Sequence, residues 1–344
     1  MKVAVIGAGV MGPGIAQVFL MGGHQVCLTD VRQEALDTGE QEIRSCLTLM
    51  ERMGVAQGAL TCLDSLTRTT TLADAVAGAD LVVEAIPERF DLKQALYGEL
   101  DQLCGQETVI VSNTSAFPLP DMMPGFRPQR FFVAHFFNPP AIIPLVELVK
   151  NDRTDPDIVL WLRRLLEDCG KKPIVLNRFV NGFLINRMQT AMAREALSLL
   201  EQGVVSPEDL DTASIVGIGF KTAWQGFFDT MDHIGLDTVA AVYQLLYPDL
   251  CNATQVPEVV LDKVRQGHLG VKTGEGFLRY DGDPATVERR RFTVLLEQLK
   301  LYTHYREESR VQWEPAHTAE ADETVDERVR IRTREEYADS TGQA

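Results

Sequence analysis

The chain has 344 residues and a formal net charge of −16, and its contents of hydrophobic residues (45%) and charged residues (24%) are ordinary for a soluble globular enzyme. A chain of this length exceeds a typical single hydrophobic core, so we expect two domains. The negative charge argues against nucleic acids and anionic membranes as partners, because both require a basic surface.

Membrane anchoring, secretion and metal binding are also not expected. No apolar run approaches the roughly 20 residues that cross a bilayer. Met1 leads directly into an apolar strand, which is not the pattern of a signal peptide. The six cysteines lack the CxxC or CxxH spacing of a zinc site, and unpaired thiols fit a reducing compartment. We therefore expect a cytoplasmic protein without a metal site.

The first 30 residues predict a strand, a glycine turn, a helix that begins near Val10, and a second strand. Val10 and Met11 are expected to contact the cofactor together with the glycines of the turn. The turn has the pattern GxGxxG, with Gly7, Gly9 and Gly12 at its defining positions. The first glycine permits the tight turn, the second lets the backbone approach a pyrophosphate, and the third lets the helix pack closely on the strand. The helix N-terminus then offers N–H groups to that pyrophosphate.

Asp30 ends the second strand, 23 residues after Gly7. A carboxylate at this position can accept hydrogen bonds from the adenosine ribose hydroxyls, and it would repel a 2′-phosphate. We therefore predict NAD as the cofactor in preference to NADP, although Arg32 lies near enough to temper this preference. FAD or a role without a nucleotide is the alternative.

The next elements alternate between helices and apolar strands. Residues 31–60 predict a long helical arm, inserted where a plain strand–helix–strand unit would have a short connection. Strands are expected at 67–70, 80–86, 108–112, 131–135, 145–149 and 172–176, and helices at 72–77, 92–103 and 157–169. This alternation predicts an α/β fold, a Rossmann-type doubly wound and mostly parallel sheet over residues 1–180.

The remainder of the chain predicts an all-α domain over residues 181–302. Helices are expected at 184–202, 207–215, 227–247, 257–266 and 288–302. Several are apolar on more than one face, so this domain is expected to bind substrate and to form a homodimer interface. Residues 303–344 are rich in charge and predict a loosely attached tail with one edge strand at 325–334.

Polar residues at the ends of the predicted strands are the first candidates for chemistry, because these ends face the ligand crevice of a doubly wound sheet. Glu147 lies in the middle of an apolar strand, and a buried carboxylate has to be paired or neutralised. His135, at the end of the preceding strand, is the candidate partner. Such a pair can orient a catalytic imidazole, or it can be purely structural. The pattern alone leaves both interpretations open.

The order of several motifs resembles that of the L-3-hydroxyacyl-CoA dehydrogenase family, and the resemblance covers residues 1–302. The motifs that carry it are the glycine turn 7–12, VVEAIPE at 82–88, SNTS at 112–115, HFFNP at 135–139, GFLINR at 182–187 and KTGEGF at 272–277. The resemblance implies NAD as cofactor and a small-molecule substrate.

The resemblance also implies roles for single residues. His135 would be the general base that takes the proton of the substrate hydroxyl, and Glu147 would orient it and stabilise the imidazolium. Ser115 and Asn186 would hydrogen-bond the substrate oxygens. Positions that contact the cofactor in the family correspond to Glu88, Lys93, Ser115, Asn138 and Lys272. Without the resemblance, Glu88 would be interpreted as a helix cap and Lys93 as a surface charge. Ser115 would be a polar residue at a strand end, Asn138 a turn residue and Lys272 a loop residue.

The arm departs from the pattern of the fatty-acid enzymes, which offer a serine and a lysine there to coenzyme A. An ungapped alignment places Cys46 and Met53 at those positions, and Arg44 and Arg52 are the arm's basic residues. This weakens the case for a ligand with several negative charges. The loop 219–226 is more similar to lambda-crystallin, an L-gulonate 3-dehydrogenase, and to a pyridoxine-degrading dehydrogenase.

The leading hypothesis is therefore the NAD-dependent oxidation of a 3-hydroxyacyl-CoA to the 3-oxoacyl-CoA, as in fatty acid metabolism. The alternative with the same chemistry is a dehydrogenase of a small hydroxy acid or alcohol without coenzyme A. The third possibility is a non-catalytic dinucleotide-binding protein, as crystallin relatives illustrate, and the joint presence of Ser115, His135, Glu147 and Asn186 argues against it.

Overall fold

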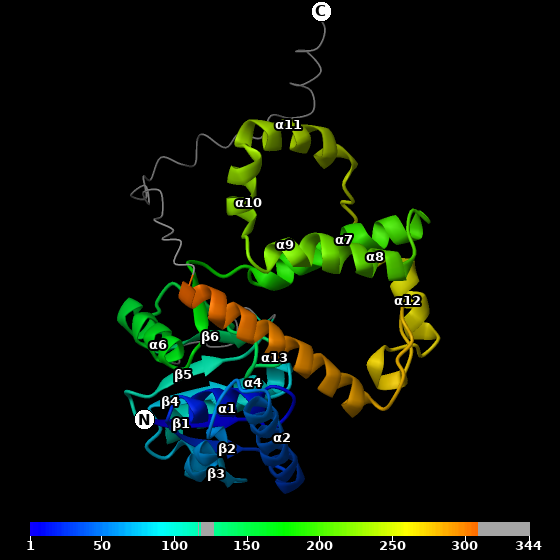
Figure 1. Ribbon diagram of the computed structural model, residues 1–344. Coiled ribbons are helices and arrows are strands. Elements are labelled where there is room, and N and C mark those ends of the chain that lie inside the picture. The colour runs from blue at the N-terminus through cyan, green and yellow to red at the C-terminus, as the bar shows by residue number, and fades with distance from the viewer. Residues whose placement is uncertain (116, 118–126, 309–344) are drawn as a thin grey trace, which may run out of the picture. The chain divides into compact units, whose positions relative to one another are not determined.

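The computed structural model describes residues 1–115, 117 and 127–308 (Figure 1), and residues Met1–Lys300 form one compact unit. Its centre is an eight-stranded sheet in the order β3-β2-β1-β4-β5-β6-β7-β8. All neighbouring strands are parallel except β6 and β7, which are antiparallel. The strands are β1 (Lys2–Ile6), β2 (Gln25–Thr29), β3 (Leu66–Thr69), β4 (Leu81–Glu84), β5 (Val109–Ser112), β6 (Phe131–Phe136), β7 (Leu145–Val149) and β8 (Lys172–Leu176).

Alternate residues of strands β1 and β4 to β8 enter different hydrophobic clusters, one on each face of the sheet. In β1, Val3 and Val5 belong to the first cluster, whereas Ala4 and Ile6 belong to the second. Helices α1 (Gly12–Met21), α2 (Gln33–Arg52) and α6 (Pro156–Asp168) contribute to the first cluster, and α3 (Leu72–Val76) and α4 (Phe90–Leu103) to the second. The expected doubly wound α/β fold is therefore confirmed.

The arm is α2, a single 20-residue helix followed by the 3₁₀ helix η1 (Ala59–Ser65). Its first three-quarters pack on the sheet through Leu36, Ile43 and Leu47. Its last turn belongs to a third cluster, where Met50 meets Leu296 of the C-terminal helix. Gly54 follows with a φ of +70°, so the helix ends before the expected arm of 31–60 does.

The second half of the described chain is helical. It contains α7 (Ile185–Glu201), α8 (Pro207–Ala213), the π-helical turn η2 (Ser214–Gly219), α9 (Phe220–Thr222), α10 (Phe227–Ile234), α11 (Leu236–Leu246), the 3₁₀ turns η3 (Tyr247–Asp249) and η4 (Val271–Thr273), α12 (Glu258–Arg265) and α13 (Pro284–Glu308). Among the described residues, no helix is both long and apolar enough to cross a membrane.

Three boundaries differ from the expectation. The first helix begins at Gly12 and not near Val10, and the single helix expected over 227–247 is two helices. Gly235 separates these two with a φ of +96°, a backbone conformation that ends a right-handed helix. The last helix is longer at both ends than the expected 288–302. The strand expected at 325–334 lies outside the described residues.

Candidate active site

The glycine turn after β1 has the geometry of a dinucleotide-binding loop. A Cβ on Gly7 would lie 2.6 Å from the carbonyl oxygen of Ala85, and a Cβ on Gly12 would lie 1.7 Å from the carbonyl oxygen of Gly7. Side chains are therefore excluded at both positions. A Cβ on Gly9 would meet nothing within 4 Å, so this backbone is open to a ligand.

The first turn of α1 supplies the donors for such a ligand. The helix begins after Met11, and no side chain of the described residues caps its N-terminus. Val10, just before it, is 77% exposed. Uncapped N–H groups at the start of a 10-residue helix fit a pyrophosphate, which matches both their hydrogen-bonding need and the positive end of the helix dipole.

Asp30 is fixed at the rim of the same turn. Its Oδ2 accepts a hydrogen bond from the N–H of Ala8 at 2.9 Å, and its Oδ1 accepts one from the N–H of Arg32 at 3.0 Å. Each carboxylate oxygen keeps a lone pair for a ribose hydroxyl. The guanidinium of Arg32 is largely in solvent, and its Nε lies 3.8 Å from Oδ1, so it weakens the carboxylate's charge very little.

His135 and Glu147 face one another in the register of the antiparallel strands β6 and β7. The Nδ1 of His135 lies 2.8 Å from the Oε2 of Glu147, and the two residues are 6% and 0% exposed. The rings of Phe137 and Phe183 enclose the imidazole, with centroids at 4.6 and 5.4 Å. A carboxylate accepts, so Nδ1 carries the proton and donates it, which leaves Nε2 as the basic nitrogen.

The other oxygen of Glu147 holds the start of α7. Its Oε1 accepts hydrogen bonds from the N–H groups of Leu184 and Ile185, both at 3.0 Å. Phe183 makes this possible with a φ of +49°, a left-handed conformation that is costly for a residue with a side chain. Asn186 is the second residue of α7, so the carboxylate that orients His135 also positions the helix turn that carries Asn186.

The loop after β5 brings Ser115 to the same edge of the sheet. The side-chain oxygen of Asn113 accepts a hydrogen bond from the N–H of Phe136 at 2.8 Å, and this ties the loop to the residue after His135. The N–H of Ser115 donates to Oε1 of Glu88 at 3.1 Å. Glu88 therefore contacts the loop that carries Ser115.

Lys93 is a buried residue and not a surface charge. It is 1% exposed, and its Nζ lies 2.6 Å from Oε1 of Glu84 and 3.2 Å from Oε2 of Glu88. Glu84 is fully buried and was not selected from the sequence. The sequence does contain a signal for Glu84. Like Glu147, it is a carboxylate within an apolar strand, at its end in one case and in its middle in the other.

Asn138 and Lys272 lie at the margins of this arrangement. Asn138 is exposed, precedes a cis peptide bond to Pro139, and its carbonyl oxygen accepts a hydrogen bond from Nη2 of Arg291 at 3.2 Å. Lys272 is exposed on η4, and no hydrogen bond described for it connects it to the sheet. The structure thus pairs His135 with Glu147 and ties the first turn of α7 and the loop of Asn113 to the same strands, whereas no hydrogen bond described for Lys272 connects it to them.

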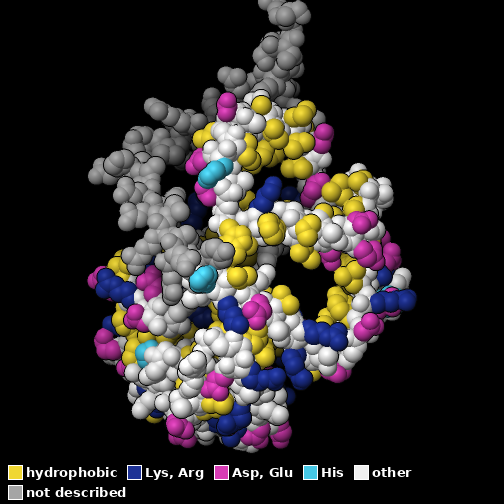
Figure 2. Space-filling model, in the orientation of Figure 1, with side chains coloured by type: hydrophobic (Ala, Val, Ile, Leu, Met, Phe, Trp, Pro, Cys, Tyr) yellow, Lys and Arg dark blue, Asp and Glu magenta, His cyan; other side chains and the backbone are white. Residues whose placement is uncertain are grey.

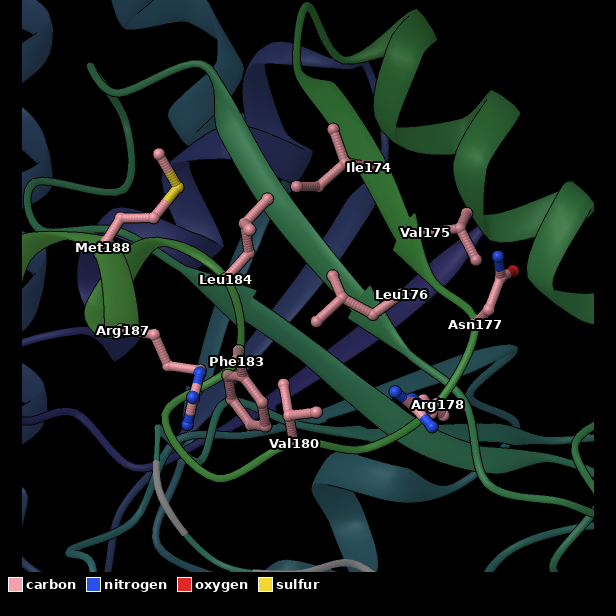
Figure 3. A pocket seen from close by; sticks show the side chains of 10 residues that line it. All are labelled: Ile174, Val175, Leu176, Asn177, Arg178, Val180, Phe183, Leu184, Arg187 and Met188. Carbon is pink, nitrogen blue, oxygen red and sulfur yellow. The ribbon is translucent and has the colours of Figure 1, made fainter. Parts of the chain in front are cut away.

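Figure 3 shows the residues that line a cavity of about 530 Å³, between β8 and the start of α7. It shares Phe183 and Leu184 with the surroundings of Glu147, and β8 forms its other wall. Its lining is mostly apolar and includes Arg178 and Arg187, but it has no residue that could exchange a proton near neutral pH. Of the side chains described around the cavity and the cluster, the imidazole of His135 is the group suited to proton exchange. Within the described chain, no three or more His, Cys, Asp or Glu residues are grouped to hold a metal ion.

Two consecutive segments of the sequence each match a family model. Residues 2–179 match the NAD binding domain of 3-hydroxyacyl-CoA dehydrogenase, and residues 182–280 match its C-terminal domain. The chain belongs to the 3-hydroxyacyl-CoA dehydrogenase family. As a member, it is an NAD-dependent oxidoreductase that acts on a CH–OH group, and the open Gly9 backbone, the uncapped α1 and Asp30 fit the cofactor.

Relatives in this family differ in the substrates that their names give. The chain is 37% identical over 280 residues to the 5-formyl-3-hydroxy-2-methylpyridine 4-carboxylate 5-dehydrogenase of Mesorhizobium japonicum, covering 81% of this chain and 90% of the relative. A crystal structure of an enzyme of that name, an NAD⁺-dependent dismutase, is similar with a TM-score of 0.82 at 34% identity, over 88% of this chain and 98% of the other. The 3-hydroxybutyryl-CoA dehydrogenase of Escherichia coli gives a TM-score of 0.68 at 32% identity, over 82% and 60%.

Proposed function

We propose that the protein oxidises a hydroxyl group to a carbonyl with His135 as general base. The observation that carries this is the 2.8 Å hydrogen bond between buried His135 and Glu147, which leaves Nε2 of the imidazole to take the hydroxyl proton. NAD, when bound, accepts the hydride. Glu147 stabilises the resulting imidazolium, and Ser115 and Asn186 donate hydrogen bonds to the substrate oxygen in both its alcohol and carbonyl forms.

The substrate that we propose is a small hydroxy compound without coenzyme A. Cys46 and Met53, which align with coenzyme A contacts of the fatty-acid enzymes, belong to the third apolar cluster together with Phe292 and Leu296 of α13. The arm therefore directs these side chains toward a helix of the chain itself. The greater similarity in TM-score to the pyridine carboxylate dehydrogenase than to the Escherichia coli enzyme supports the same choice.

The second candidate is the oxidation of a 3-hydroxyacyl-CoA. The family models, and the relatives that are named for coenzyme A thioesters, support it. Both candidates use the same base and cofactor. They differ in the effect of coenzyme A, which is bulky and anionic. It either adds binding energy or is obstructed by α13.

A matched pair of substrates separates the two candidates. We expect kcat/KM for a free hydroxy acid such as 3-hydroxybutyrate, or for a hydroxymethyl pyridine carboxylate, to exceed that for 3-hydroxybutyryl-CoA by about tenfold or more, equivalent to roughly 1.4 kcal/mol. NADH absorbance gives the rates. Desulfo-coenzyme A should not inhibit. Faster turnover of the thioester, with competitive inhibition by desulfo-coenzyme A, would reverse the choice of substrate.

We also propose that the chain has an NAD-binding domain at 1–180 and a helical domain at 181–302 that forms a homodimer. Between residues 185 and 280, Val239 and Gly276 are the buried residues, so this segment has almost no core of its own. Figure 2 shows hydrophobic side chains gathered over α11, where Leu236, Leu245 and Leu246 are 62%, 73% and 49% exposed. An apolar surface of this kind needs a partner, and a second copy supplies an identical one.

The mass in solution checks the dimer. We expect light scattering to give about twice the chain mass of 38.2 kDa. Leu245→Glu should shift the protein toward monomer, because it places a charge in the apolar surface. Gln244→Glu is the matched control on the adjacent position of α11. A monomer at micromolar concentration, or dissociation by both variants alike, would contradict this interface.

A further inference from the structure

We propose that Glu84 is a positioning residue for cofactor binding. Its carboxylate fixes Lys93, and through Lys93 it sets the orientation of Glu88 at the edge of the sheet. The proposal needs only that the protein binds NAD, so it stands apart from the choice of substrate.

Glu84 lies at the end of β4 and is 0% exposed. Its Oε1 accepts hydrogen bonds from Nζ of Lys93 at 2.6 Å and from the N–H of Ile86 at 2.9 Å. Its Oε2 accepts them from the hydroxyls of Tyr97 and Ser112, both at 2.6 Å. A buried carboxylate with four donors is held in a single orientation.

Tyr97 donates a hydrogen bond to Glu84. The ring is 3% exposed and packs on Phe131 with ring centroids 5.0 Å apart. Burial raises the pKa of Tyr97 far above its usual range, and the charge of Glu84 raises it further. Its hydroxyl therefore stays protonated at every pH that the protein tolerates, and it fixes one carboxylate oxygen permanently.

Lys93 connects Glu84 to Glu88 at the edge of the sheet. Its ammonium lies between Glu84 and Glu88, and the side chain of Glu88 is 36% exposed whereas that of Lys93 is 1% exposed. Lys93 itself therefore offers almost no exposed surface. Glu88 is the member of this chain of ion pairs that reaches the surface, next to the N–H of Ser115.

A second branch runs from Glu84 to the same loop. Ser112 donates to Glu84 and accepts a hydrogen bond from the N–H of Thr114 at 3.1 Å. The hydroxyl of Thr114 in turn donates to Oε1 of Glu88. Glu84 is therefore connected to Glu88 by two routes, one ionic and one through the loop.

A double-mutant cycle on the full-length protein tests the proposal. Glu84→Gln keeps the shape but removes the charge, so Lys93 keeps one carboxylate and draws Glu88 inward. We expect the dissociation constant of NADH, measured by fluorescence titration, to rise about tenfold in Glu84→Gln and in Glu88→Gln. The double variant should be no weaker than the weaker single variant, because Glu84 acts through Glu88. Tyr97→Phe keeps the charge and should change the constant by less than about threefold.

Several results would overturn the proposal. If Glu84→Gln lowers the melting temperature but leaves NADH affinity unchanged, the residue is structural. If the two single effects add in the double variant, Glu84 does not act through Glu88. If Glu84→Gln does not fold, Ser112→Ala interrupts the loop route alone; it should weaken NADH binding about threefold, and unchanged affinity would count against the proposal. None of these measurements requires turnover of any substrate.

Discussion

His135→Gln is expected to lower kcat by about 10³-fold or more while NADH still binds with its normal affinity. The amide cannot take a proton from the hydroxyl group, and His135 lies outside the glycine turn, α1 and Asp30 that we assign to the dinucleotide. Steady-state rates with the best substrate of the matched panel, together with NADH titration, measure the two effects separately.

The control is His24→Gln, which changes a partly buried histidine at the end of the turn after α1. It should leave kcat within about twofold, because surface and turn substitutions away from a site rarely change more. Full activity of His135→Gln would remove this histidine from the mechanism. Loss of NADH binding in the same variant would show that it holds the cofactor and is not the base.

Glu147→Gln is expected to have an effect of similar size for a different reason. The amide oxygen can still accept the N–H groups of Leu184 and Ile185, but its NH₂ group then faces Nδ1 of His135. Two donors cannot share this contact, so the imidazole has to place its proton on Nε2, where it no longer accepts one. An inverted tautomer of this kind costs on the order of 10³- to 10⁴-fold in kcat in an enzyme with a carboxylate-oriented histidine.

The fold should survive this change with a cost of about 1–3 kcal/mol in the free energy of unfolding, since the lost partner is buried. Thermal denaturation measures that cost. Glu275→Gln is a matched control, because Glu275 lies 3.8 Å from Nδ1 of His268, a second His–Glu contact remote from the sheet. If both variants lose activity equally, the effect of Glu147→Gln is not specific to the pair with His135.

Much of the sheet could be predicted from residue patterns, because apolar strands between helices have few alternative arrangements. The pair of His135 and Glu147 could be predicted for a related reason: a carboxylate within an apolar strand needs a partner, and the neighbouring strand offered one histidine. The same argument predicts a partner for Glu84, because it is also a carboxylate in an apolar strand.

Other features depend on contacts that no local pattern specifies. The hydrogen bonds from Leu184 and Ile185 to Glu147 require a left-handed Phe183, a conformation that its own side chain disfavours. The stripe of Phe292, Leu296 and Leu299 predicts that α13 buries one face, but not that this face meets the arm. The break at Gly235 was missed because apolar periodicity continues on both sides of it.

The hydrogen bonds between Glu147 and the first turn of α7 have a consequence for partly folded chains. The cofactor loop is complete within the first 30 residues, but the carboxylate of Glu147 receives all its hydrogen bonds only when the helical segment has begun to fold. A chain whose helices have frayed would thus keep its dinucleotide and lose the oriented base. Such locally unfolded molecules would bind the cofactor but could not take the proton of a substrate hydroxyl.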